Sequence, residues 1–276
     1  MKCLSDQDLR EFLEFKYHQY NRPEFIETDP ISIPHRFTKR EDIEIAGFLT
    51  ATISWGTRKG ILKNAGRLMD MMDQAPYDFV MNAGNKELEP MRKFVHRTFN
   101  GNDCVSFIKS LKNCYSNYGG MEELFSIDGN TESEKSISSF RKIFLENSND
   151  PHVAKHIADP MKNASAKRIL MFLRWMIRKD SHGVDFGIWT KRQPSHLICP
   201  LDVHVGSVAR KLGLLSCKSN DWKAAEELTS SLCKFDPADP VKYDFALSRI
   251  GIVENCTGKY NAACQFCELN DFCKLR

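Results

Sequence analysis

The sequence has no long hydrophobic run. None of its stretches reaches the roughly 18 uncharged apolar residues that a membrane-spanning helix needs. Residues 1–8 become polar and acidic before the apolar segment of a signal peptide could form. Turn residues flanked by alternating apolar strands are also absent. We therefore expect a soluble protein without β-hairpins that resides in the cytoplasm.

The sequence also has little net charge, since 39 Lys and Arg residues against 36 Asp and Glu residues leave +3 at pH 7. So small an excess does not by itself indicate nucleic-acid binding. The basic residues are nevertheless concentrated, because the segment 153–192 holds nine of them and three acidic residues. This segment predicts a surface for phosphate groups, with Arg174 and Arg178 facing phosphate or solvent. A solvated helix face is the alternative.

Helical periodicity covers most of the 276 residues, whose 42% hydrophobic content suffices for one large domain or two smaller ones. The first helix begins behind a capping pair formed by Ser5 and Asp8. The other helices are expected near residues 38–53, 58–73, 104–117, 134–146, 165–179, 204–214, 221–234 and 239–253. An all-α fold follows. The segment 180–200, with Gly183 and Gly187, is expected to be a surface loop or a domain junction.

Four cysteines within the last 21 residues follow the pattern C-x7-C-x2-C-x5-C: Cys256, Cys264, Cys267 and Cys273. Four thiolates from one short segment can surround a metal centre in a reducing compartment. Zinc ribbons usually present two C-x2-C pairs and this chain has one, so the pattern favours a [4Fe-4S] cluster, with zinc as the alternative. The other six cysteines are expected to pack as small apolar residues. The histidines form no set with the spacing of metal ligands.

Helices throughout and a four-cysteine segment make the sequence resemble the endonuclease III branch of the helix-hairpin-helix DNA glycosylases. The family's cluster segment reads C-x6-C-x2-C-x5-C, one residue shorter in its first gap. Residues 201–205, with 209–214, are similar to the family's stretch around its catalytic aspartate. Residues 45–51 are similar to the first helix of its six-helix barrel. Residues 168–175 and 183–189 resemble most closely a bacterial family of uncharacterised function within the same superfamily.

The resemblance implies two helical domains. Residues 37–190 would form the six-helix barrel domain with a hairpin-like segment. Residues 195–276, joined by the N-terminal segment 1–36, would form the iron-sulfur cluster domain. The implied partner is double-stranded DNA in the groove between the domains, with RNA as the alternative, and we expect a monomer.

Two catalytic residues are implied by the same resemblance. Asp202 corresponds to the catalytic aspartate and would stabilise the oxocarbenium character of the sugar during base release. It also precedes a helix as an N-cap residue would, and the two roles are compatible. Lys167 corresponds to the lysine that attacks the sugar in lyase-competent members. A solvated or phosphate-contacting lysine is the alternative role, and Lys162 is a competing nucleophile.

The family's hairpin, Leu-Pro-Gly-Val-Gly-Arg-Lys-Thr-Ala, corresponds to residues 159–168 here, where both glycines are missing. Asn163 can adopt the left-handed conformation, and Ser165 can cap the next helix, so a hairpin is still expected. The DNA-binding residues expected here are Lys162, Asn163, Ser165 and Arg168. Among the aromatic residues, Trp189 is the expected contact for an extruded base, ahead of Trp55 and Trp175.

The expected function is therefore removal of a damaged or modified DNA base by cleavage of its N-glycosidic bond, with lyase activity added by Lys167. One alternative is a non-catalytic iron-sulfur protein that binds nucleic acid on the same scaffold, which the missing hairpin glycines favour. The other alternative is a helical interaction protein stapled by zinc.

Overall fold

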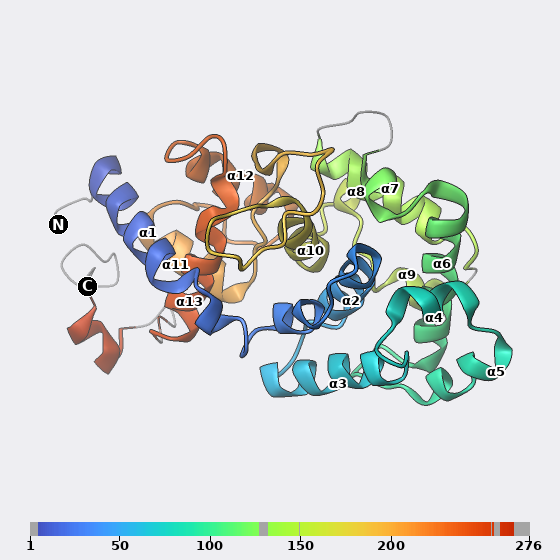
Figure 1. The fold of residues 1–276 in the computed structure, drawn as a ribbon. Coiled ribbons are helices and arrows are strands. Elements are labelled where there is room, and N and C mark those ends of the chain that lie inside the picture. Colours follow the sequence, from blue (N-terminus) through green and yellow to red (C-terminus); the bar gives the residue numbers. More distant parts are fainter. Residues whose placement is uncertain (1–4, 127–131, 149, 255, 257–259, 268–276) are drawn as a thin grey trace.

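The structure is a computed structural model that describes residues 5–126, 132–148, 150–254, 256 and 260–267 (Figure 1). Helices make up its regular structure, which confirms the all-α expectation. An isolated bridge between His96 and Phe99 is the one β-type pairing among these residues. None of the described helices combines the length and the apolar character needed to cross a lipid bilayer.

The described part of the chain contains α-helices joined by short 3-10 turns. The α-helices are α1 (Asp6–Tyr20), α2 (Arg40–Thr52), α3 (Arg58–Asp70), α4 (Pro76–Asn82), α5 (Asn85–Leu88), α6 (Gly101–Tyr118), α7 (Met121–Phe125), α8 (Ser133–Phe144), α9 (Pro151–Ala154), α10 (Lys167–Ile177), α11 (Val203–Leu212), α12 (Trp222–Cys233) and α13 (Asp244–Ile252). The 3-10 turns are η1 (Pro23–Phe25), η2 (Pro30–Ser32), η3 (Pro34–Arg36), η4 (Pro90–Lys93), η6 (Pro160–Lys162), η7 (Pro194–His196), η8 (Pro240–Tyr243) and η9 (Ala262–Phe266). Most of these turns begin with proline, whose fixed φ suits the first helical position.

The start of α1 follows its capping signal. The Ser5 hydroxyl accepts the Asp8 N–H at 3.1 Å, and the Asp8 carboxylate accepts the Ser5 N–H at 3.1 Å, so the predicted capping box is confirmed. The second helix begins two residues later than predicted, at Arg40, behind an extended Lys39 that makes no side-chain cap. The sequence signal thus located this helix correctly but not its first residue.

The helices are arranged around the central pair of α2 and α10, which pack against each other (Figure 1). Helices α3 to α6 lie towards one end of the molecule and α11 to α13 towards the other. Helix α13 packs against both α11 and α1. The first and the last α-helices of the described residues therefore pack against each other.

Aromatic rings fill the core around α2. Phe48, which is 1% exposed, lies 5.9 Å from the ring of Phe107, 5.6 Å from Phe140, 5.3 Å from Phe144 and 5.5 Å from Phe172. Offset and edge-to-face contacts at these distances add to the burial of each ring. Buried apolar residues from Leu9 to Ile250 belong to one connected cluster. The packing is thus continuous across the boundary predicted between the two domains.

Arg174 of α10 and Arg178, which follows this helix, are buried with carboxylates, so the expectation that they face phosphate or solvent is wrong. Arg178 lies 3.0 Å from Asp185 and 2.8 Å from Asp239. Arg174 lies 3.3 Å from Asp185 and donates to Asp244. Burial of a guanidinium requires such partners because desolvating an unpaired charge is costly. Two of the basic residues in the segment 153–192 therefore form buried ion pairs that join α10 to its neighbours.

The segment predicted as a surface loop or junction, 180–200, packs onto the end of α10. The Phe186 N–H donates to the Trp175 carbonyl at 2.8 Å, and the Trp189 N–H donates to the Met176 carbonyl at 2.9 Å. Gly187 has a φ of +56°, and a Cβ there would lie 2.4 Å from the Cβ of Lys179. The close approach and the left-handed backbone both require glycine.

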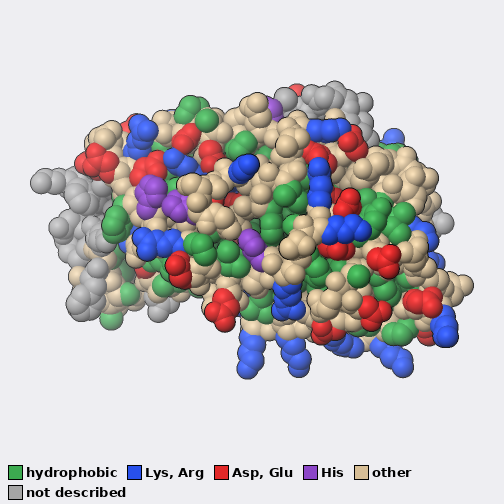
Figure 2. Space-filling model, viewed as in Figure 1, with side chains coloured by type: hydrophobic (Ala, Val, Ile, Leu, Met, Phe, Trp, Pro, Cys, Tyr) green, Lys and Arg blue, Asp and Glu red, His purple; other side chains and the backbone are tan. Residues whose placement is uncertain are grey.

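Acidic and basic side chains are interspersed over the face of the molecule shown in Figure 2. Basic side chains project along its lower edge, where α3 lies in the same view. Lys59, Lys63 and Arg67 of α3 are exposed and follow one another at four-residue intervals, so they share one helix face. This face is a basic surface that the sequence analysis did not single out.

We expect the substitution Arg178→Met to lower the free energy of unfolding by about 3–5 kcal/mol, because the buried Asp185 would keep only Arg174 as a cation and Asp239 would lose its ion pair with Arg178. Urea unfolding followed by circular dichroism measures this loss. The matched control is Lys191→Met, which removes an ion pair with Glu123 whose two side chains are each 46% exposed. That control should cost less than about 1 kcal/mol. Equal losses in the two variants would contradict a special role for the buried network.

Candidate functional site

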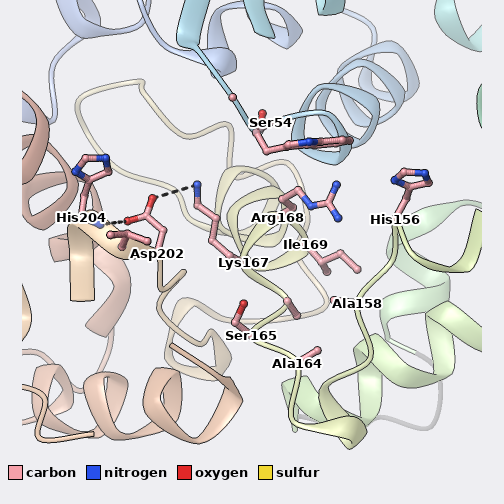
Figure 3. Close-up of a pocket in the computed structure, with 14 residues that line it drawn as sticks. Ser54, His156, Ala158, Ala164, Ser165, Lys167, Arg168, Ile169, Asp202 and His204 are labelled. Carbon is pink, nitrogen blue, oxygen red and sulfur yellow. Dashed lines mark hydrogen bonds and ion pairs between the residues drawn. The ribbon is translucent and has the colours of Figure 1, made fainter. Parts of the chain in front are cut away.

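A pocket of about 530 Å³ opens where three chain segments meet (Figure 3). Ser54 and Trp55 line it from the end of α2, Lys167 from the start of α10, and Asp202 from the start of α11. His156, which follows α9, completes this part of the lining. The volume is within the usual range for small-molecule sites, and the lining combines an aromatic ring with charged groups.

Lys167 and Asp202 are brought together in this pocket although 35 residues separate them in the sequence. The Lys167 Nζ lies 3.3 Å from Oδ2 of Asp202, and the two side chains are 29% and 27% exposed. The two predicted catalytic side chains therefore lie together in one pocket and are partly exposed to solvent. Figure 3 shows the lysine pointing from its helix towards the carboxylate.

The carboxylate of Asp202 is held by the helix that follows it. Oδ1 accepts the N–H groups of His204 and Val205, both at 2.9 Å, so Asp202 is the N-cap of α11. Oδ2 is left to face Lys167. Capping and pocket roles therefore coexist: one oxygen satisfies the helix terminus and the other faces the ammonium.

Two residues shortly before α10 have a left-handed backbone conformation. Asn163 has φ 58° and ends η6, as predicted, whereas Ala166 has φ 48° and is the N-cap of α10. Ser165 is not the cap, so that prediction is wrong, although Ser165 does line the pocket. A left-handed alanine costs about 1–2 kcal/mol, and such strain is concentrated at functional sites.

Arg168 lies against the indole of Trp55 within the pocket wall. The centre of its guanidinium is 4.7 Å from the ring centroid, and Nη1 donates to the Thr52 carbonyl. Burial lowers the pKa of Arg168 to about 10, so the side chain stays charged at neutral pH. Its guanidinium is thus placed on an aromatic plane at the pocket, a geometry worth about 0.5–2 kcal/mol.

Two histidines support Trp55, and the sequence analysis did not find them. The His156 ring is stacked with the indole at 6.0 Å and 23°, and the His96 ring meets its edge at 5.1 Å. His96 Nε2 also lies 3.0 Å from the Trp55 carbonyl oxygen. The available signal was the four-residue spacing between His152 and His156, which places both side chains on one side of the chain. The interpretation that no histidines have the spacing of metal ligands is therefore wrong, because Asp103 completes a group with these two.

Lys162 and Asn163 do not line the pocket. Both are exposed at the end of η6. The Asn163 Oδ1 accepts the N–H of Lys223 at 3.3 Å, which joins this turn to α12. They lie close to Lys167 along the chain but outside its pocket, so Lys162 is separated from Asp202.

Trp189 is not available for a base, so its prediction as a DNA contact is wrong. The side chain is 3% exposed, and its N–H donates to Glu44 Oε1 at 2.8 Å. The rings of Phe125 and Phe172 lie 5.6 and 5.4 Å away. The glycines of its segment suggested an exposed loop, but the segment folds inward over α10.

Three of the four predicted metal-binding cysteines line one cavity of about 460 Å³: Cys256, Cys264 and Cys267. Cys273 lies outside the described residues. The Lys211 ammonium donates to the Cys256 sulfur at 3.0 Å, and the Asn261 N–H donates to the Cys264 sulfur at 3.4 Å.

The distances between the three cysteine sulfurs are relevant to the kind of metal group that they could bind. Among the residues that the structure describes, the three do not form a set within 4.8 Å of one another. Sulfur ligands around a single zinc ion would lie about 3.8 Å apart, given Zn–S bonds of about 2.3 Å. Three sulfurs that line one cavity, with an ammonium and an N–H donor beside two of them, are what a thiolate-bound metal group requires.

A buried carboxylate lies behind the pocket. Asp244, the first residue of α13, is 5% exposed and accepts a hydrogen bond from Arg174. Burial raises the pKa of Asp244 to about 6, the charge of Asp202 raises it further, and Arg174 and Lys167 oppose the increase. The charges of Asp202 and Lys167 in the pocket therefore change the pKa of the Asp244 carboxyl.

The chain belongs to a protein family through a match over residues 29–253, which is most of its length. The description of that family is "Protein of unknown function (DUF2400)". The matched residues include the whole pocket, from Ser54 to His204, whereas α1 and the four cysteines lie outside the match. Comparison with curated proteins and with solved structures finds no match.

We expect Asp244 to make stability depend on pH. Its folded pKa of about 6 lies above the ordinary value of 3.8, so between about pH 4 and 6 the folded chain binds more protons than the unfolded chain. The free energy of unfolding of the wild type, minus that of Asp244→Asn, should therefore fall as pH rises through this range, by roughly 2–3 kcal/mol at most. Urea unfolding at several pH values measures the difference. A difference that is constant or rises with pH would contradict the assignment.

Proposed function

We propose that this protein is a DNA glycosylase that removes a damaged or modified base, with a lyase activity contributed by Lys167. The observation that carries the proposal is the Lys167–Asp202 pair, 3.3 Å apart in one pocket. The proposal combines this geometry with the resemblance of the sequence to the endonuclease III branch. A nucleotide turned out of the duplex would place its sugar beside the pair.

The proposed chemistry uses the two side chains differently. Cleavage of the N-glycosidic bond builds positive charge on the sugar, and the fixed Oδ2 of Asp202 stabilises it without rearranging. The Lys167 amine, once it has lost a proton, attacks C1′ of the sugar, and the base leaves with the electron pair of the broken bond. The nearby carboxylate is positioned to take part in that proton transfer. The first product is an aminal at C1′. The nitrogen lone pair then forms the C=N bond as the C1′–O4′ bond breaks and O4′ takes a proton, which gives an open-chain covalent imine that a hydride reagent can reduce.

Trp55 replaces Trp189 as the proposed contact for the extruded base. It lines the pocket and is partly exposed, and the Arg168 guanidinium and His156 ring hold it in place. Aromatic and guanidinium planes both stack on nucleobases. The same wall would therefore exclude water and orient the base.

Phosphate contacts are proposed on both sides of the pocket. On one side α3 begins soon after Trp55 and carries the exposed row of Lys59, Lys63 and Arg67. Figure 3 shows Ala164 and Ser165 on the side opposite Ser54, and the exposed Lys162 and Asn163 precede them. Backbone contacts of this kind position a duplex without reading its sequence.

The proposed architecture is the six-helix barrel over residues 37–190 with a cluster domain built from α1 and the C-terminal helices. Packing of α1 and α11 on α13 supports it. We also propose a [4Fe-4S] cluster on Cys256, Cys264, Cys267 and Cys273. When bound, such a cluster would order the end of the chain.

Borohydride trapping on a panel of damaged and abasic duplexes tests the proposed function. The wild type should form a covalent adduct and release a base from at least one substrate, and Lys167→Ala should form no adduct because the imine nitrogen is missing. Asp202→Asn should lower the rate of base release by about 100-fold or more while binding is retained. Lys109→Ala, which removes an exposed lysine of α6 that does not line the pocket, is the matched control and should trap normally.

Two outcomes would contradict this assignment. No released base and no adduct for any lesion, with the duplex still bound, would indicate the non-catalytic binding protein. An adduct that survives Lys167→Ala and disappears in Lys162→Ala would move the nucleophile to the competing lysine.

Anaerobic purification tests the cluster separately. The protein should contain about four irons per chain and show broad sulfur-to-iron charge-transfer absorption, which d10 zinc cannot give. Cys264→Ser should lose both signals. Cys217→Ser, a partly exposed cysteine on another loop, should keep them. Zinc in place of iron in the wild type would support the zinc-stapled alternative and exclude the cluster.

A further inference from the structure

Two histidines and an aspartate meet behind the wall of the pocket. His152 lies in α9, His156 follows it by four residues, and Asp103 lies in the first turn of α6. Nδ1 of His152 is 2.8 Å from Oδ1 of Asp103, and Nε2 of His156 is 3.2 Å from Oδ2. All three side chains therefore direct a ligand-type atom into one small volume, with these atoms within 4.8 Å of one another.

The environment of the three side chains suits a cation. The Asp103 side chain is fully buried, that of His156 is 4% exposed, and that of His152 is 35% exposed. The buried Nε2 of His156 has no hydrogen-bond partner of acceptable geometry, although it points at a carboxylate. Buried nitrogens are rarely left in this state without an ion or a water to bind.

We propose that Asp103, His152 and His156 bind one divalent transition-metal ion of the zinc class, with a water in the fourth position on the exposed side of His152. Two imidazoles and one carboxylate are a common ligand set for such ions, and histidines four apart have the usual ligand spacing. Ligands around a tetrahedral zinc lie about 3.3 Å apart, since the bonds are about 2.0 Å long. The two histidine nitrogens face different oxygens of Asp103, at 2.8 and 3.2 Å, so the carboxylate lies between them where an ion would be shared.

A network of hydrogen bonds alone explains the cluster less well. Asp103 already accepts the Asn100 N–H at 2.8 Å as part of the cap of α6. The carboxylate is thus fixed by its own helix, and the His156 nitrogen that faces it makes no accepted hydrogen bond. An ion between the three would satisfy this nitrogen.

A metal ion bound at this site would also affect the pocket, because one of its ligands contacts a pocket residue. The His156 ring is stacked on Trp55, and the ion would join the turn after α9 to the first turn of α6. A bound ion would therefore act as a positioning element for the indole. The binding site itself does not depend on the proposed glycosylase activity.

Zinc titration of the full-length protein, stripped of loosely bound metal by a chelator and with its cysteine segment intact, tests the proposal. Mass-spectrometric metal analysis should find one zinc per chain fewer in His152→Ala than in the wild type. Zinc should raise the thermal midpoint of the wild type, by at least about 3 °C, and leave that of the variant unchanged. The loss of one ligand should weaken binding at this site more than tenfold.

Matched controls separate this site from other metal-binding groups. His18→Ala removes an exposed imidazole elsewhere and should keep the zinc. Asp103→Asn keeps an oxygen for the Asn100 cap but removes the charge, so it should lose the zinc even if His152→Ala does not fold. Cobalt(II) in the wild type should give visible bands from nitrogen and oxygen ligands that the Asp103 variant lacks, whereas binding to the cysteines adds thiolate charge transfer.

Equal zinc content and equal thermal shifts in the wild type, His152→Ala and Asp103→Asn would overturn the proposal and leave a hydrogen-bonded cluster only. Loss of the same zinc in His18→Ala would show that surface imidazoles hold it. Because duplex trapping does not enter these measurements, failure here leaves the proposed function unaffected, and the reverse is also true.

Discussion

Arg174 and Arg178 are buried with their carboxylates, and this pairing fixes α10 at the centre of the molecule. Their partners come from the segment after α10 and from the neighbourhood of α13, so three parts of the chain depend on the same charges. A buried guanidinium cannot exchange its partner for water without a large desolvation penalty. The register of α10 is thereby fixed at its C-terminal half, and the position of Lys167 at its start follows.

The opposite end of α10 is less rigidly supported by side chains and more by backbone geometry. It is entered through the left-handed Asn163 and Ala166, without a side-chain cap. Asp202, by contrast, is held by two N–H groups of α11. In this pair the position of Lys167 is set by α10, and the position of the Asp202 carboxylate is set by its hydrogen bonds to the start of α11. Such preorganisation is what electrostatic stabilisation of a developing charge requires.

The sequence allowed the helical class, most helix positions and the cap at Ser5 to be predicted, because periodicity and capping are local signals. It also indicated Asp202 and Lys167, whose meeting in one pocket required the fold. Trp189 and the two buried arginines were placed wrongly, since charge and glycine content suggest exposure while the partners Glu44, Asp239 and Asp244 are distant in sequence. His152 and His156 were missed because Asp103, which completes their cluster, comes from another helix.

The packing of α1 on α13 joins two parts of the chain that are far apart in the sequence. Leu13 and Tyr17 of α1 are buried, and the Tyr243 hydroxyl donates to Glu14 at 2.6 Å. More than 200 residues separate α1 from α13 in the sequence. The face of α1 that packs on α13 can therefore be covered only by a contact of long sequence separation, which is the kind of contact that slows folding.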